Sequence, residues 1–321
     1  MNSFSQLVKQ FEERFINTLP FPAEPNGLYD PCRYLLKLGG KRVRPVLCLM
    51  ANELFGEITE DAWHAAAAIE LFHNFTLIHD DIMDKAPLRR GNPTIHAKYG
   101  MTAGILCGDI TCIYSYRELA KVRNVLPLVL QIFNKTGIEV CEGQQLDMDF
   151  ESRNDVSIDE YIHMITLKTS VLLACSLKIG GLLGGATEGN ANKLYEFGKN
   201  LGIAFQLQDD YLDAFGATDK LGKQQGGDIK ANKKTYLHLK AWETASAFQR
   251  QGINEWLQND SEEKVPAMLN LFGETGADVA CREAVNLYSQ KAFESLEDVA
   301  VISKRKHALH ELASYLLQRD K

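Results

Sequence analysis

The feature that most constrains the fold of this chain is a long apolar segment, residues 60–84, that is rich in alanine and leucine. The segment contains neither glycine nor proline, and Pro87 follows shortly after its end. Alanine and leucine favour the helical conformation, and a strand of this length would be exceptional in a globular protein. We therefore expect one long, largely buried helix here.

Helical spacing of apolar residues continues in other parts of the chain. Phe4, Leu7 and Phe11 follow one another at helical intervals near the N-terminus. Asp30 and Pro31 form a cap and first-turn pair that predicts the start of a helix, and glycines at 39 and 40 predict its end.

The second half of the chain shows the same pattern. Ser157 and Glu160 have the spacing of a capping box, ahead of an apolar helix predicted over residues 161–183, and a further helix is predicted over residues 192–215. We find no strand-type alternation bounded by hairpin turns, no proline- and serine-rich linker, and no repeat of solenoid period. The sequence therefore predicts an all-α fold with a single domain over residues 1–321.

Composition and charge exclude several classes of protein. The formal net charge of −7 leaves no basic excess to neutralise the phosphates of a nucleic acid, so we expect no nucleic-acid partner. The longest apolar run, residues 171–185, is interrupted by Ser176 and Lys178, so we expect no integral membrane segment. The 7 cysteines are scattered without a CxxC pair, which indicates reduced, mostly buried thiols in a cytoplasmic protein.

Two acidic clusters carry the chemistry of the sequence. Asp80, Asp81 and Asp84 end the long apolar segment and lie within one helical turn. A second cluster at the end of another apolar segment repeats this spacing with the residues Asp209, Asp210 and Asp213. One such cluster could be a solvated helix end, but two at the ends of buried helices favour a pair that holds a diphosphate through Mg²⁺, which prefers carboxylate oxygens and phosphates.

In these motifs the sequence resembles the trans-polyprenyl diphosphate synthase family, which includes farnesyl and geranylgeranyl diphosphate synthases. Seven blocks carry the resemblance over nearly the whole chain: GGKRVRP (39–45), HDDIMDKAPLRRG (79–91), GQQLDMDFE (143–151), KTS (168–170), FQLQDDYLD (205–213), LGKQQGGD (221–228) and NKKTY (232–236). The resemblance implies a helical bundle of the isoprenoid synthase type with a central active-site cavity, and a homodimer.

The resemblance also implies roles for individual residues. Three Mg²⁺ ions would be bound with the allylic diphosphate by Asp80, Asp81, Asp84, Asp209 and Asp210, with Asp213 in a secondary role. The allylic diphosphate would also contact Arg89, Lys168, Lys223 and Lys233. Isopentenyl diphosphate would be held without metal by Lys41, Arg44, His73 and Arg90, with Phe205 packed on its isopentenyl group. The implied catalytic residues are Lys168, Thr169 and Gln206, of which the last two would stabilise the allylic cation.

The implied reaction is ionisation, condensation and elimination, with dimethylallyl, geranyl or farnesyl diphosphate as the allylic substrate. We expect geranylgeranyl diphosphate as the product and farnesyl diphosphate as the second candidate. Bulky residues before the first acidic motif limit product length in the family, which indicates Phe75, Thr76 and Phe72 here. On an ideal helix Phe75 lies about 140° from Asp80 and Thr76 only about 40° away, so Phe75 could also be ordinary core packing.

Each basic or polar motif also has an ordinary structural interpretation. Lys41 and Arg44 could belong to a solvated loop, and His73 could be a hydrogen-bonded core histidine. Two other functions stay open: a class I terpene cyclase, and a non-catalytic subunit of a heteromeric synthase. A cyclase usually lacks the basic blocks and the second DDxxD motif, and a non-catalytic subunit tends to have eroded acidic motifs. Both motifs are intact here, so the synthase is the favoured hypothesis.

Overall fold

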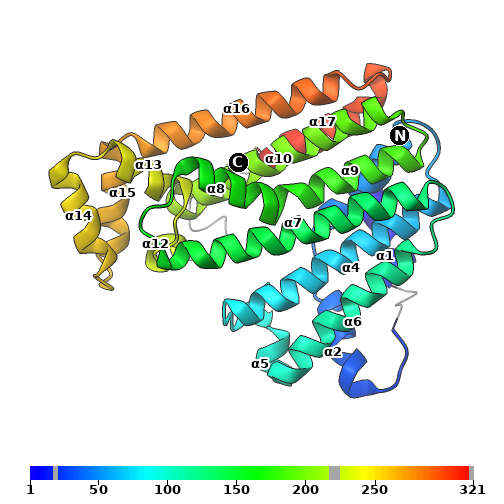
Figure 1. The fold of residues 1–321 in the computed structure, drawn as a ribbon, viewed down its shortest axis with the longest axis horizontal. Coiled ribbons are helices and arrows are strands. Elements are labelled where there is room, and N and C mark those ends of the chain that lie inside the picture. Colours follow the sequence, from blue (N-terminus) through cyan, green and yellow to red (C-terminus); the bar gives the residue numbers. More distant parts are fainter. Residues whose placement is uncertain (17–20, 217–224, 318–321) are drawn as a thin grey trace. The chain divides into compact units, whose positions relative to one another are not determined.

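The computed structural model describes residues 1–16, 21–216 and 225–317, and over these residues the chain is almost entirely helical (Figure 1). The all-α prediction is confirmed. The chain forms two compact units. The first comprises Met1–Lys135, Cys175–Tyr195 and Asp298–Leu309, and the second Thr136–Ala174, Glu196–Glu297 and His310–Lys321. That the two units act as a single domain stays a prediction.

The first unit is built from helices of the N-terminal part of the chain and one small hairpin. Its elements are α1 (Phe4–Ile16), α2 (Asn26–Lys37), α3 (Val43–Glu53), α4 (Glu60–Met83), β1 (Leu88–Arg89), β2 (Asn92–Pro93), α5 (Ile95–Tyr99) and α6 (Met101–Leu119). Among the described residues four helices have residues in both units: α7 (Leu126–Ser152), α9 (Val171–Leu183), α10 (Glu188–Phe215) and α17 (Ser303–Leu317). Most of α9 belongs to the first unit.

The second unit contains the remaining elements. They are α8 (Ile158–Ile165), the π-helix η1 (Thr166–Ser170), α12 (Gly227–Lys230), α13 (Tyr236–Thr244), α14 (Ala247–Leu257), α15 (Lys264–Glu274) and α16 (Ala277–Glu297). One part of its core packs Phe150, Tyr161 and Leu207 together, so α7, α8 and α10 share a buried apolar face.

Helix α4 runs beside α6, and the contact depends on two glycines of α6 (Figure 1). A Cβ atom added to Gly104 would lie 2.9 Å from the Ile82 side chain, and one added to Gly108 would collide with the His79 ring. Small residues one turn apart therefore let the C-terminal part of α4 approach α6 closely. This part of α4 carries the first acidic motif.

Glycine has the same function where α9 packs on α3. A Cβ atom on Gly184 would lie 2.5 Å from the Asn52 carbonyl oxygen, and one on Gly180 would overlap the Cys48 carbonyl. The Asn52 side chain donates a hydrogen bond to the Gly180 carbonyl at 3.2 Å and accepts one from the Thr59 amide at 3.1 Å. The same Thr59 is the N-cap of α4 and accepts from Ala62. Packing and capping together fix where α4 begins.

Most predicted helix boundaries are confirmed, including those of α1, α4 and the capping box of Ser157 and Glu160 at α8. The predicted start of a helix at Asp30 is wrong, because α2 begins at Asn26 and includes Pro31. The physical reason is that the Asp30 carboxylate pairs with Arg33 at 2.7 Å instead of capping a helix, while Arg33 also binds the Pro22 carbonyl. The absence of strands was also overstated, since β1 and β2 form a minimal antiparallel hairpin.

The expectation that no apolar run is long enough to cross a membrane is corrected in one respect. Among the described residues one stretch, Ile158–Leu183, is long and apolar enough by length and composition, and 67% of its most apolar window is buried within the protein. Such burial is common for a core helix, so the stretch is weak evidence for a membrane segment. The prediction of reduced, mostly buried cysteines is confirmed, because none of the seven forms a disulfide and five are buried.

The close contact between α9 and α3 generates a stability prediction. Gly180→Ala should lower the free energy of unfolding by about 1–3 kcal/mol, because the added Cβ meets backbone atoms that cannot move aside. Gly189→Ala is the matched control: Gly189 lies in the first turn of α10 with open space around it, so this change should be neutral or stabilising. Urea unfolding of both variants at one protein concentration measures the difference, and equal midpoints would contradict the packing account.

Candidate functional site

The first acidic motif lies at the C-terminal end of α4. Asp80 is half-buried, Asp81 is only 3% exposed, and Asp84 is exposed and forms the C-cap of the helix. The three carboxylates therefore range from buried to solvated within one turn. A buried carboxylate is costly unless it is paired, so the partner of Asp81 defines this part of the site.

Arg89 is that partner, and the hairpin β1–β2 positions it. Its Nε donates to Asp81 Oδ2 at 2.8 Å, and its Nη2 lies 2.7 Å from Asp81 Oδ1 and 3.6 Å from Asp80 Oδ2. The turn of the hairpin is formed by Arg90 and Gly91, both with positive φ (53° and 75°), as a two-residue turn between antiparallel strands favours. This turn places two consecutive arginines near the acidic end of α4.

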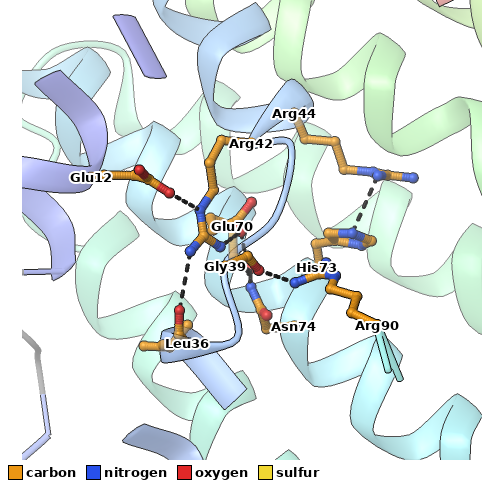
Figure 2. A network of polar contacts seen from close by, with 9 residues as sticks. All are labelled: Glu12, Leu36, Gly39, Arg42, Arg44, Glu70, His73, Asn74 and Arg90. Carbon is orange, nitrogen blue, oxygen red and sulfur yellow. Dashed lines mark hydrogen bonds and ion pairs between the residues drawn. The ribbon is translucent and has the colours of Figure 1, made fainter. Parts of the chain in front are cut away.

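A second group of cations surrounds His73, two turns earlier on α4 (Figure 2). Arg44 Nη1 lies 3.3 Å from His73 Nε2, and Arg90 Nη1 donates a hydrogen bond to the Gly39 carbonyl. Arg44 Nε is buried and has no hydrogen-bond partner among the described residues. The arginine N–H groups of this cluster can therefore donate hydrogen bonds to an anion.

The charge state of this group follows from its surroundings. Burial, and then the guanidinium groups of Arg44 and Arg90, hold the pKa of His73 well below its ordinary value, so the imidazole is neutral near pH 7. Burial also lowers the pKa of Arg44 to about 10, which leaves the guanidinium protonated. The result is a neutral histidine among arginines, which suits an anionic ligand and no cation. Lys41, the other predicted member, is exposed in the loop before α3.

In the second unit the predicted catalytic residues Lys168 and Thr169 lie on the π-helix η1. A Cβ atom added to Gly143 of α7 would overlap the backbone of Lys168, and one added to Gly202 of α10 would lie 2.6 Å from the Ser170 Cα. Two glycines therefore allow α7 and α10 to approach η1 closely. A π-helical turn inside a helix is rare and is frequent at functional sites.

A chain of hydrogen bonds links η1 to the second acidic motif. Thr169 Oγ1 donates to Gln206 Oε1 at 3.4 Å, and Gln206 Nε2 donates to Asp210 Oδ1 at 3.2 Å. The Tyr161 hydroxyl and the Tyr236 amide both donate to Asp210 Oδ2. The structure thus brings together Thr169, Gln206 and Asp210 from η1 and α10.

Burial is the main cause that raises the pKa of Asp210 to about 7, while the hydrogen bond from Tyr161 opposes the shift. A nearby cation would favour the ionised carboxylate, as it does for any buried acid. Asp210 is only 4% exposed, whereas Asp209 beside it is exposed. The second motif therefore repeats the combination of a buried and a solvated carboxylate that the first motif shows.

The remaining predicted residues of the second unit have different surroundings. Asp213 accepts a hydrogen bond from the Asp228 amide at 2.9 Å, at the N-terminus of α12. Lys233 is mostly exposed and lies 3.5 Å from the Asp228 carboxylate. Phe205 is half-buried on α10. Lys223 lies outside the described residues.

Two residues that contact predicted site residues, Asp147 and Tyr161, received no role from the sequence. Lys168 Nζ donates to Asp147 Oδ2 at 2.5 Å, and Tyr161 binds Asp210. Asp147 belongs to the block GQQLDMDFE, which the sequence pattern singled out without assigning a role to it. Its position one turn after Gly143, the residue that contacts η1, is the signal that could have indicated a contact with Lys168.

The three predicted product-length residues lie on α4. Phe72 is buried against Phe133 at a ring-centroid distance of 5.2 Å, and Phe75 packs between Phe72 and His79 at 5.4 and 5.0 Å. The Thr76 hydroxyl donates to the His73 carbonyl within its own helix. Phe75 is thus part of an aromatic row along α4, in agreement with the ordinary packing that the helical wheel suggested.

The donor set of each acidic motif fits Mg²⁺. Among the described residues no three histidine, cysteine, aspartate or glutamate side chains form a preformed metal site. Mg²⁺ is usually held by one or two carboxylates together with substrate phosphates and water, so it does not need such a preformed cage. Asp80 and Asp81 in the first motif, and Asp209 and Asp210 in the second, supply oxygen donors of this kind.

Comparison with known proteins identifies the family of the chain. The family model of polyprenyl synthetase matches residues 25–272. A geranylgeranyl diphosphate synthase of Methanosarcina mazei is 40% identical over 299 residues, which cover 92% of this chain and 91% of that protein. A geranylgeranyl pyrophosphate synthase of Geoglobus acetivorans is 39% identical over 301 residues, with 92% of each chain covered.

Solved structures agree with the sequence comparison. A crystal structure of a geranylgeranyl pyrophosphate synthase matches 100% of both chains with a TM-score of 0.93 and 43% identity. A family match over most of the chain and relatives near 40% identity show the family and its fold. The chain belongs to the polyprenyl synthetase family and is a prenyltransferase.

Proposed function

We propose that this prenyltransferase condenses isopentenyl diphosphate with an allylic diphosphate, and that its principal product is geranylgeranyl diphosphate. The observation that carries the proposal is the arrangement on α4, which presents carboxylates at its end and a neutral histidine among arginines two turns earlier. One helix thus offers oxygen donors for a metal-bound diphosphate and cationic donors for a second diphosphate. The names of the similar proteins support the twenty-carbon product.

Isopentenyl diphosphate is the ligand we assign to the cationic group. Arg44 and Arg90 supply guanidinium donors, His73 supplies an uncharged ring nitrogen, and Lys41 adds a flexible point charge from the exposed loop. A metal is not required there, because the protein's own cations balance the charge of the diphosphate.

We assign the allylic diphosphate to the acidic motifs. Asp80, Asp81 and Asp84 of the first motif, and Asp209 and Asp210 of the second, are the proposed ligands of Mg²⁺, three ions in all, with Asp213 in a secondary role. Bound Mg²⁺ would neutralise the charge that develops on the leaving diphosphate. Arg89, which already contacts Asp80 and Asp81, would contribute to the same anion, as would Lys168, Lys223 and Lys233.

The cation left by ionisation needs acceptor oxygens and no water. Thr169 Oγ1 and Gln206 Oε1 lie together beside Asp210 and can orient their oxygens toward such a cation. The ion pair with Asp147 restricts the position of the Lys168 ammonium group. Phe205 is proposed to pack on the isopentenyl group and to help exclude water, which would otherwise quench the cation.

We further propose a cytoplasmic homodimer. Several large apolar side chains of α6 are exposed, among them Leu106 (51%) and Ile113 (62%), two turns apart on one face of the helix. Exposed apolar residues in such a row favour contact with a second copy of the chain. Phe72, Phe75 and Thr76 stay the proposed determinants of product length, with farnesyl diphosphate as the alternative product.

A product assay on the purified protein tests the proposed function. With Mg²⁺, isopentenyl diphosphate and dimethylallyl, geranyl or farnesyl diphosphate in turn, we expect linear prenyl diphosphates that end at twenty carbons. Chromatography of the dephosphorylated alcohols measures their length. Cyclic hydrocarbons made from the allylic substrate alone would assign the chain to the terpene cyclases. No turnover with any starter would point to a non-catalytic subunit.

The close contact between Gly143 of α7 and the backbone of η1 generates a second prediction. Gly143→Ala should lower kcat by about a hundredfold, because the added Cβ displaces the backbone of Lys168 and small misplacements of catalytic groups are costly. Gly252→Ala in α14 is the control, since its Cβ would make only an ordinary contact at 3.9 Å with Leu271. Steady-state kinetics with circular dichroism of both variants separates displacement from unfolding. Unchanged kcat in the Gly143 variant would remove η1 from the catalytic account.

A further inference from the structure

Arg42 stands in the middle of a basic run, Lys41-Arg42-Val43-Arg44, yet it does not lie with its neighbours. Lys41 is exposed and Arg44 half-buried, whereas Arg42 is only 3% exposed. Its backbone has φ 50° and ψ 31°, the left-handed region, immediately before α3. A non-glycine residue is strained in this conformation, so the surrounding structure must stabilise it.

Each of the three nitrogens of the Arg42 guanidinium donates a hydrogen bond (Figure 2). Its Nη1 donates to Glu70 Oε1 at 2.5 Å, its Nε to Glu12 Oε1 at 3.3 Å, and its Nη2 to the Leu36 carbonyl at 3.1 Å. The guanidinium is thus occupied by groups of α4, α1 and α2. These three contacts all lie within the first unit, while the positive charge of Arg42 also lowers the pKa of Arg90.

Glu70 is the central acceptor of this group. Its side chain is 4% exposed and lies one turn before His73 on α4, and Asn74 Nδ2 also donates to its Oε1 at 3.1 Å. The negative charge of Glu70 raises the pKa of both Arg44 and Arg90, against the lowering effect of burial. Glu70 is therefore close enough to act electrostatically on the cationic group.

The Arg42–Glu70 ion pair fixes the loop of residues 38–42 against α4. Within this loop the Gly39 carbonyl accepts a hydrogen bond from Arg90, and a Cβ on Gly40 would lie 3.1 Å from the Arg90 guanidinium. The loop also leads directly into Arg44, at the second position of α3. The pair thus determines where three cations of the proposed isopentenyl diphosphate site, Lys41, Arg44 and Arg90, are held.

We propose that Arg42 and Glu70 are positioning residues for the isopentenyl diphosphate site, and that Arg42 itself does not bind the diphosphate. The inference rests on the proposed function of this site. It separates the basic run into ligands, Lys41 and Arg44, and an internal anchor, Arg42. It also assigns a buried glutamate to a site that binds an anion.

The variant Glu70→Gln distinguishes an anchor from a purely electrostatic group, because the two accounts predict opposite signs. Removing a negative charge beside a cationic site should tighten the binding of an anion if only charge matters. If Glu70 anchors the loop, the neutral amide holds Arg42 more weakly, the loop relaxes, and affinity falls by about tenfold or more. Calorimetric titration of the full-length protein with isopentenyl diphosphate, without Mg²⁺, measures the sign.

Steady-state kinetics then shows which substrate site the Glu70→Gln change affects. In Glu70→Gln we expect KM for isopentenyl diphosphate to rise by about tenfold, with kcat and KM for the allylic substrate changed by less than about threefold. Arg42→Lys keeps the charge but loses the forked geometry, and should resemble Glu70→Gln. Glu12→Gln is the matched control: Glu12 contacts the same guanidinium but is 41% exposed, so KM should change by less than about twofold.

Removal of one partner of a buried ion pair can unfold a protein, so a second variant is needed. Arg42→Met combined with Glu70→Leu removes both charges and is expected to stay folded, with the same weakened binding of isopentenyl diphosphate. Equal or tighter binding in folded Glu70→Gln, or a double variant with wild-type affinity, would overturn the inference alone. A wild-type protein that neither binds nor consumes isopentenyl diphosphate would overturn the proposed function, and this inference with it.

Discussion

The ion pair between Arg89 and the buried Asp81 carboxylate is the interaction on which the candidate site depends. The long apolar helix α4 carries Asp81 into the interior, where an unpaired carboxylate would cost several kcal/mol. The hairpin after α4 returns the chain so that Arg89 meets Asp81 with two nitrogens. The same return places Arg90 against Gly39, so a single compensated charge organises the acidic end of α4 and the loop before α3.

The same constraint recurs at each buried acid of the site. Glu70 is compensated by Arg42, and Asp210 is held by Tyr161 and Gln206 without a cationic side chain among these contacts. Such groups seldom increase stability compared with apolar side chains of the same size. Binding of two diphosphates, one with metal and one without, is the function that we propose for them. Within each unit, glycines allow close helix contacts near these groups: α6 approaches the end of α4, and α7 and α10 approach η1.

The periodic features of the sequence predicted the fold well. The bounds of α4, the capping box of α8 and the all-helical character follow from local patterns, which depend on neighbouring residues alone. The start of α2 could not be predicted from Asp30 and Pro31, because the contact of Asp30 with Arg33 competes with capping. The two-residue strands of the hairpin are too short to produce a visible alternation.

The candidate site was predictable in its motifs and unpredictable in its partners. Asp80, Asp81, Thr169 and Gln206 stand in recognisable blocks, and the structure pairs Thr169 with Gln206. Glu70 and Tyr161 stand in no motif, because their roles arise from contacts 28 and 49 residues away in the chain. Arg42 shows the limit most clearly, since its place in a basic run suggests a ligand while its left-handed backbone turns it inward.

The most direct measurement of the central claim is the binding of inorganic diphosphate to the wild-type protein and to Asp80→Ala, with and without Mg²⁺. Asp80 is half-buried, and Arg89 lies closer to Asp81 (2.7 Å) than to Asp80 (3.6 Å). Removal of the Asp80 carboxylate should therefore leave the fold intact. We expect Mg²⁺ to strengthen diphosphate binding in the wild type by about a hundredfold or more, and Asp80→Ala to lose this gain. A gain of equal size in both proteins, in calorimetric titrations at one ionic strength, would contradict the assignment of the first acidic motif to the metal-bound diphosphate.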